Sequence, residues 1–332
     1  MKQSRERVYA FDFMRVVSAM GIVLFHFSCH TNCGRKPLLF FANGDYGLVF
    51  VTIFFMMSGA MLYYNNKEIP SLKKFYFKRW KSIYPLFYMA FLYYYLQRVF
   101  ETKQWFYMGN PKMLFLTLIG MDGYLSYCTT NYFLVGEWFV GAIVIVYLLY
   151  PLVLAGFKRS VLFTTIVIAG LYSLVFIIPG MFYGMPYHQN IFVCLLSFEL
   201  GMLFMEYKEK LEHKWVLIVS VLLCLILCNL SLPINKNVAE QLLGISLFAV
   251  LYFVGNYVMK AAPVKTVITG LGSITYPIFL IQHQVILKVL NFRNPDGVGK
   301  MILVLLFTIG LIIAEAEILT VVERAVMKRC KL

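Results

Sequence analysis

The chain has 332 residues, of which 61% are hydrophobic and only 14% are charged, and its mean hydropathy is +0.74. A soluble domain carries roughly 25% charged residues, so this composition excludes an ordinary soluble protein and predicts an integral membrane protein. The formal net charge of +14 would point to nucleic acid in a soluble protein. Here the basic residues fall in short segments between apolar runs, which indicates positive-inside topology and no nucleic-acid partner.

Apolar runs of about 20 residues, long enough to cross a bilayer, recur along the chain. The charge-free run over residues 160–198 is too long for one helix, and we expect it to break at Pro179-Gly180 and at Gly184-Met185-Pro186. The sequence therefore predicts an all-α, polytopic membrane protein with about ten transmembrane helices, near residues 9–29, 45–64, 82–100, 132–154, 161–179, 188–206, 214–231, 240–258, 268–288 and 301–322.

The distribution of basic residues gives the expected orientation. With the N-terminus inside, the inner segments hold 20 Lys and Arg residues and the outer segments hold nine. This asymmetry favours both termini in the cytoplasm. We expect a single transmembrane domain over residues 1–332, with no appended soluble domain.

The first predicted span carries Asp12, Arg15 and His26 within an otherwise apolar sequence. Charged side chains cost several kcal/mol in hydrocarbon, so they usually face protein or a water-filled cavity. The eleven residues from Arg15 to His26 make about three helical turns, and Asp12 precedes Arg15 by one turn, so all three lie on one side of the helix. Two interpretations stay open, a polar seam between helices and a functional site.

A buried Arg15 needs a counter-charge, and Asp12 is the nearest carboxylate in sequence. Glu199, Glu315 and Glu317 are further carboxylates within predicted spans. Residues 315 and 317 point about 200° apart on a helix, so we expect only one of them to face other helices. A structural ion pair is the expected role of each.

Two further side chains have both an ordinary and a functional interpretation. His283, in the ninth predicted span, could share a cavity with His26, although a packed histidine is the more frequent case. Trp138 precedes an apolar run, where an interfacial tryptophan needs no special cause.

The seven cysteines show no zinc spacing with histidine partners, and no cluster of ligands predicts a bound metal. Cys29 and Cys33 flank an expected outer loop and could pair in an oxidising compartment.

Residues 67–81, KEIPSLKKFYFKRWK, hold six basic residues and are expected to form an inner loop. Positive-inside charge explains this loop without any further function. The alternative is a dock for an anionic cytoplasmic ligand, because Lys78, Arg79 and Lys81 lie where the next span begins.

Five stretches follow one another along nearly the whole chain. They are FDFMRVVSAMGIVLFH (11–26), FFMMSG (54–59), FYFKRWKSIYP (75–85), WFVGAIVIVYLLYP (138–151) and ITYPIFLIQH (274–283). Together they resemble the motifs of the acyltransferase-3 family of multi-pass membrane O-acyltransferases. In its opening signature an Arg is followed after ten residues by a His, as Arg15 and His26 are here.

The sequence departs from the family pattern at three places. Ser82 stands where the family has a second Arg before Ile-x-Pro. The Glu pair of one large subgroup falls at Ile143 and Val144, so any role tied to those acids is absent. His283 lies one residue after the usual position, which Gln282 occupies.

The resemblance implies transfer of an acyl group, commonly acetyl from cytoplasmic acetyl-CoA, to a hydroxyl of a cell-envelope polysaccharide or glycolipid. It implies a bacterial cytoplasmic membrane as the location. His26 would act as general base or carry the acyl group as a covalent relay. Arg15 would position the donor, and Asp12 would orient Arg15.

Acyl-CoA is implied as a co-substrate and not as a bound cofactor. The residues assigned to its binding are Lys78, Arg79, Lys81 and Ser58. Further candidates for the site are Trp138, Glu199, His283 and Glu315. The other implied partners are the lipid bilayer and the carbohydrate or glycolipid acceptor.

Two alternatives remain at this point. Embedded Asp, Arg, Glu and His residues would also suit a proton-coupled secondary transporter, although the sequence shows no inverted repeat. A non-catalytic partner in polysaccharide export is the other alternative.

Overall fold

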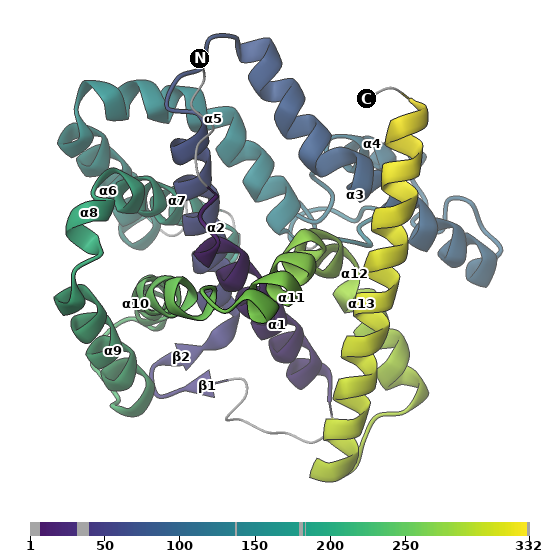
Figure 1. Cartoon of the computed structure of the whole chain (residues 1–332). Helices are drawn as coiled ribbons and strands as arrows, with labels where there is room; N and C mark the ends of the chain where they lie inside the picture. Colours follow the sequence, from purple (N-terminus) through teal and green to yellow (C-terminus); the bar gives the residue numbers. More distant parts are fainter. Residues whose placement is uncertain (1–6, 32–39, 137, 179–181, 183, 331–332) are drawn as a thin grey trace. The chain divides into compact units, whose positions relative to one another are not determined.

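The computed structural model describes residues 7–31, 40–136, 138–178, 182 and 184–330. The regular structure of these residues is helical except for one antiparallel pair of two-residue strands, β1 (Phe40–Phe41) and β2 (Gly44–Asp45) (Figure 1). The all-α fold class is therefore confirmed for the part of the chain that the structure describes.

Five helices among the described residues are long and apolar enough to cross a membrane. They are α1 (Ala10–His30), α2 (Tyr46–Asn65), α5 (Phe139–Arg159), α10 (Lys236–Val258) and α13 (Val298–Arg329). The bent pair α11 (Ala262–Ser273) and α12 (Thr275–Phe292) makes a sixth if it is counted as one span. The chain is thus a helical integral membrane protein, and its ten spans and cytoplasmic termini stay predictions.

Helices also lie at the remaining expected positions. They are α3 (Leu72–Thr102), α6 (Val161–Ile177), α7 (Ile191–Glu206) and α9 (Lys214–Asn229), and the short elements between helices are η2 (Pro111–Met113), α4 (Leu114–Leu118), η4 (Tyr187–Gln189) and α8 (Lys208–Leu211). The expected break after α6 is confirmed, because α6 ends at Ile177 and α7 begins at Ile191. Pro179 and Gly180 lie outside the described residues.

Two expected boundaries are wrong, and one expected span is interrupted. The basic segment 67–81 is not a loop throughout, because Ser71 caps α3 by accepting the N–H of Lys74, and the helix therefore includes most of the cations. The fourth span begins at Phe139 and not at residue 132. The ninth span is interrupted at one residue, Ile274, between α11 and α12.

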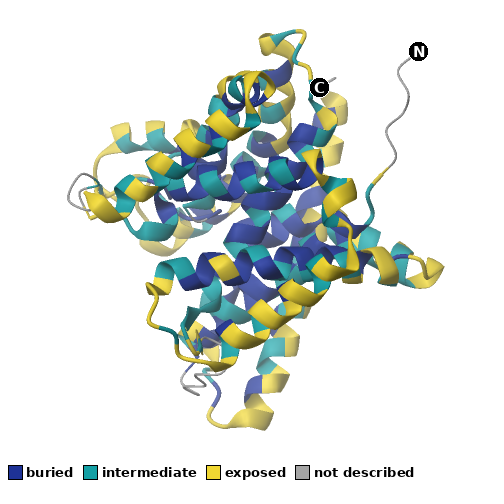
Figure 2. Cartoon of the chain, turned by 90° about the vertical axis from the view of Figure 1, so that its left-hand side faces the viewer, coloured by how far each residue is buried: buried dark blue, intermediate teal, exposed yellow. Residues whose placement is uncertain are grey.

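The chain divides into two compact units. The first comprises Met1–Glu68 and Leu195–Thr275, and the second comprises Ile69–Cys194 and Tyr276–Leu332. Within each unit, buried residues gather where helices meet and exposed residues cover the outward faces (Figure 2).

In the first unit, α1, α2 and α10 pack against one another, and α9 and α11 add to them. The aromatic core includes Phe11 of α1, Phe204 of α7 and Phe248 of α10, whose ring centroids lie 5.0–6.4 Å apart in contacting pairs. The α2–α7 crossing is closer still. A Cβ placed on Gly59 would overlap the carbonyl oxygen of Phe198, and one on Gly201 would overlap that of Met56.

The side chain of Asn43 attaches the β1–β2 hairpin to the end of α9 and to the connection that follows it. The Nδ2 group of Asn43 donates to the carbonyl oxygens of Leu227 and Leu230, each at 2.6 Å. Its Oδ1 accepts the N–H of Leu232 at 2.7 Å. All three bonds join residues at least 184 positions apart, so the hairpin depends on a late part of the chain.

In the second unit, α3 packs against α5 and α13. The segment between α4 and α5 folds around Asp122, whose carboxylate accepts the hydroxyl of Thr117 and the N–H of Gly123. Burial raises the pKa of Asp122 to about 6. The hydroxyl of Tyr84 donates to the Ile119 carbonyl and attaches this segment to α3.

We predict that Gly59→Ala destabilises the protein by about 1–3 kcal/mol, because the added methyl group must push the α2 and α7 backbones apart. Gly170→Ala is the matched control. Gly170 also lies inside an apolar helix, but a Cβ there meets no atom within 4 Å, so alanine should be neutral or slightly stabilising. Thermal unfolding in detergent measures both. Equal melting temperatures for the two variants would contradict the close crossing.

Candidate functional site

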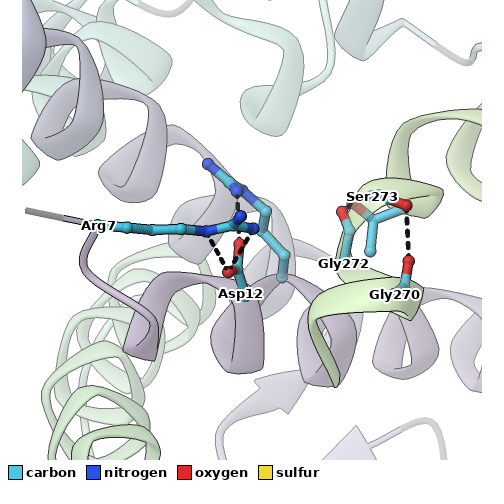
Figure 3. Close-up of polar contacts among 7 residues, drawn as sticks. Arg7, Asp12, Gly270, Gly272 and Ser273 are labelled. Atoms are coloured by element: carbon cyan, nitrogen blue, oxygen red, sulfur yellow. Dashed lines mark hydrogen bonds and ion pairs between the residues drawn. The ribbon is translucent and has the colours of Figure 1, made fainter. Parts of the chain in front are cut away.

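The buried carboxylate of Asp12 binds two arginines in the first unit. Its Oδ2 lies 2.7 Å from an Nη of Arg7, and its Oδ1 lies 3.1 Å from an Nη of Arg15. Only 4% of the Asp12 side chain is exposed, whereas Arg7 and Arg15 are 54% and 33% exposed. Figure 3 shows Arg7 reaching Asp12 from the chain that precedes α1. Asp12 is therefore confirmed as a counter-charge of Arg15, and Arg7 is a partner that the sequence interpretation missed.

The end of α11 packs against the backbone and Cβ of Asp12. A Cβ on Gly272 would lie 3.4 Å from the Cβ of Asp12 (Figure 3). The hydroxyl of Ser273 donates to the Gly270 carbonyl at 2.7 Å, at the end of α11. Lys265 of α11 places its ammonium 3.5 Å from the centroid of the Tyr9 ring. Two arginines therefore share one carboxylate, so the cluster of Arg7, Asp12 and Arg15 carries a net positive charge, and Lys265 lies on the neighbouring Tyr9 ring.

His26 lies near the other end of the same helix. Because α1 is one continuous helix, the eleven residues between Arg15 and His26 correspond to a rise of about 16 Å and a rotation of only about 20°. The shared side of the helix is confirmed by this geometry. His26 is half-buried, and its ring lies 5.6 Å from that of Phe25 in an edge-on contact. The Arg15 cluster and His26 thus lie about three turns apart along α1.

A second polar cluster lies near the His26 end. Lys236 bonds Asp45 at 2.7 Å and lies 3.5 Å from Glu240, whose carboxylate also accepts the Asp45 N–H. The ring of Phe25 packs on Gly47, which brings the start of α2 beside the last turns of α1. Sequence reasoning missed the buried Glu240, although Lys236 and Glu240 have the spacing of a helical ion pair.

Ser58 and Glu199 both lie at the close crossing of α2 and α7. Ser58 is half-buried and precedes Gly59, and Glu199 is fully buried and follows Phe198. Helix packing thus explains why the FFMMSG stretch has a glycine at residue 59, since its lack of a side chain allows the two helix backbones to touch. The assignment of Ser58 to acyl-CoA binding stays a prediction.

The three cations assigned to acyl-CoA binding, all in the second unit, differ in how far they are exposed. Lys78 and Lys81 are exposed, whereas Arg79 is half-buried and its guanidinium lies 5.7 Å from the centroid of the Tyr147 ring. The Arg79 Nε is buried and has no hydrogen-bond partner among the described residues. A cavity of about 350 Å³ adjoins it, with an aromatic lining that includes Trp80 and Tyr84.

Trp138 and His283 belong to the second unit. Trp138 precedes α5, and its ring lies 5.1 Å from that of His188. His283 is half-buried on α12, while its neighbour Gln282 is fully buried with an amide that has no hydrogen-bond partner in the described residues. Gln282, and not His283, therefore occupies the interior position. A cavity shared by His26 and His283 stays a prediction.

The α13 carboxylates divide as their spacing predicts. Glu315 is half-buried and accepts the hydroxyl of Tyr94 on α3 at 2.5 Å, whereas Glu317 is exposed. Only Glu315 faces other helices, which confirms the expectation from their spacing.

The family model described as an acyltransferase domain, that of the acyltransferase-3 family, matches residues 8–315. The chain belongs to the acyltransferase-3 family. No curated protein and no solved structure matches it. The acyltransferase-3 domain covers most of both units, including Asp12, Arg15, His26 and the Arg79 cavity. The protein is accordingly a membrane acyltransferase.

The structure also bears on the expectations about a bound metal and about a disulfide between Cys29 and Cys33. Among the described residues, no group of three or more His, Cys, Asp and Glu side chains could hold a metal ion. Cys29 is exposed at the end of α1, but Cys33 lies outside the described residues, so their pairing stays a prediction.

We predict that Asp12→Asn lowers the free energy of unfolding by about 1–3 kcal/mol, because two guanidiniums lose the carboxylate between them. Partial exposure of both arginines keeps the loss below that of a fully buried pair. The loss should shrink in high salt, which screens the repulsion between Arg7 and Arg15. Thermal unfolding in detergent at low and high salt tests this. The exposed Glu317→Gln is the control, and an equal effect of both changes would contradict a special role for Asp12.

Proposed function

We propose that this membrane acyltransferase transfers an acyl group, most simply acetyl, from cytoplasmic acyl-CoA to a hydroxyl of a cell-envelope polysaccharide or glycolipid. The observation that carries the proposal is the placement of Arg15 and His26 on one continuous helix within the acyltransferase-3 domain. The positive Arg15 cluster suits an anionic donor, and the half-buried imidazole suits proton transfer near neutral pH.

His26 has one of two chemical roles in this proposal. As general base, its imidazole takes the proton of the acceptor hydroxyl while that oxygen attacks the thioester carbon. The carbon–sulfur bond then breaks, and the CoA thiolate takes up a proton. As a relay, an imidazole nitrogen attacks the thioester first, CoA leaves, and the acceptor hydroxyl removes the acyl group from His26.

Arg15 steadies the thioester end or the phosphopantetheine arm of the donor. Asp12 holds the Arg15 guanidinium from one side, at 3.1 Å, and so limits its rotation. Arg7 shares the same carboxylate and thereby maintains the net positive charge around Arg15. Asp12 and Arg7 are positioning residues in this account.

Arg79 is the strongest candidate for contact with the CoA phosphates. A guanidinium presents a fork of donors that matches phosphate oxygens, and the Arg79 Nε is not used by any described residue. Contact with the Tyr147 ring restricts the side chain on its other face. Lys78 and Lys81 are exposed and would add mainly long-range attraction.

We also propose ten spans with both termini in the cytoplasm of a bacterium and the chain in its cytoplasmic membrane. The 20 to nine distribution of basic residues supports this orientation. It places the Arg15 end of α1 on the cytoplasmic side, where acyl-CoA is found, and the His26 end towards the envelope.

A proton-coupled carrier is the second candidate, and one observation favours it. The break between α11 and α12 beside Asp12 is of the kind that transporters use at substrate sites. Uptake of a labelled solute into liposomes without acetyl transfer would support the carrier.

We predict that His26→Ala loses acetyl-CoA turnover by a factor of about 10²–10⁴, because proton transfer or the covalent relay is removed. Acetyl transfer, exchange or hydrolysis by purified protein measures this. The exposed His213→Ala is the control and should turn over like wild type. Labelled acetyl retained on wild-type protein would identify the relay. Wild-type turnover by His26→Ala would remove His26 from the site.

We predict that Arg79→Ala raises the KM for acetyl-CoA about tenfold or more and leaves the KM for the acceptor nearly unchanged, because charge-assisted bonds to phosphate are lost. The double variant Lys78→Ala with Lys81→Ala should raise the KM for acetyl-CoA less, and mainly at low salt. Steady-state kinetics with each substrate varied separately makes the comparison. Equal changes in both KM values would argue against a donor dock at Arg79.

A further inference from the structure

A groove of about 300 Å³ lies between the last turns of α12 and the first turns of α13 in the second unit. Its walls are mostly apolar and include Phe292, Leu303 and Phe307. Two cations, Arg293 and Lys300, complete the lining. Neither the acyl-transfer proposal nor its donor dock uses any of these residues.

The apolar walls are unusually exposed. Phe292, Leu303 and Phe307 are 92%, 69% and 61% exposed. Only 22% of the apolar window of α13 is buried within the protein, less than in α1, α2, α5 or α10. A contiguous exposed apolar surface on a membrane helix is matched by hydrocarbon chains of lipid.

The charges of the groove do not cancel. Lys300 bonds Asp296 at 2.8 Å, and this hydrogen bond lowers the pKa of Asp296, so the carboxylate is ionised at neutral pH. One carboxylate stands against two cations and leaves one net positive charge. Lys288, one turn before Phe292, does not add to the groove, because it bonds Gln97 and lies over the Tyr94 ring of α3.

We propose that this groove binds an anionic phospholipid of the bilayer. The phosphate accepts hydrogen bonds from Arg293 and Lys300, and an acyl chain lies along Phe292, Leu303 and Phe307. A headgroup with one net negative charge complements the groove, whereas a zwitterionic headgroup brings a cation of its own. Basic pockets between membrane helices bind anionic headgroups in this way. The proposal is independent of acyl transfer.

The test is lipid retention by the purified full-length protein, measured by native mass spectrometry. The probes are phosphatidylglycerol and phosphatidylcholine with identical acyl chains, together with glycerol 3-phosphate, which has no chains. We expect wild-type protein to retain phosphatidylglycerol about fivefold or more over phosphatidylcholine, from one net charge near the headgroup. Glycerol 3-phosphate should bind far more weakly.

Arg293→Gln with Lys300→Gln should abolish the preference for phosphatidylglycerol, and Arg293→Lys with Lys300→Arg should keep it. Arg98→Gln is the matched control, because Arg98 is an exposed arginine in the same unit that also pairs with a nearby carboxylate, that of Glu101. Equal retention of the two lipids by wild-type protein would overturn the proposal. Unchanged preference in the double Gln variant, or equally tight binding of glycerol 3-phosphate, would also overturn it.

Discussion

A carboxylate shared by two guanidiniums allows the first helix to carry charge into the membrane. An isolated arginine in hydrocarbon would be costly, but Asp12 lies beside Arg15 on the same helix and needs no distant element to reach it. Arg7 also bonds Asp12 from the chain that precedes α1, and α11 packs on the backbone and Cβ of Asp12 through Gly272. The charges at the start of α1 are therefore paired mainly by residues close in sequence. The rest of α1 packs against α2 and α10.

Three further carboxylates of the two units follow the same constraint. Glu240 is covered by Lys236 and the Asp45 backbone, Glu315 by the Tyr94 hydroxyl, and Asp122 by its own turn. Arg79 differs from these groups, because its buried Nε has no partner among the described residues while an aromatic cavity adjoins it. A guanidinium with an unpaired donor beside a cavity can bind an anion, whereas paired charges mainly stabilise helix packing.

The sequence predicted the features that depend on local spacing. Apolar run lengths located the helices, and helical spacing predicted both the Asp12–Arg15 pair and that only one of Glu315 and Glu317 faces other helices. It missed what depends on distant residues, such as the aromatic wall that Tyr147 provides for Arg79 and the contact of Asp45 with Glu240. Helix ends were also uncertain, because the fourth apolar run continues through the non-helical residues before Phe139.

The three hydrogen bonds of Asn43 have a consequence for biogenesis. They join the hairpin after the first helix to backbone groups as far as 189 residues later, so the hairpin is unattached while the intervening helices are being synthesised. At the usual 5–20 residues per second, this interval lasts roughly 10 to 40 s. During that time the β1–β2 hairpin is accessible to chaperones and proteases on its side of the membrane, and synthesis of the residues that bind Asn43 ends this exposure.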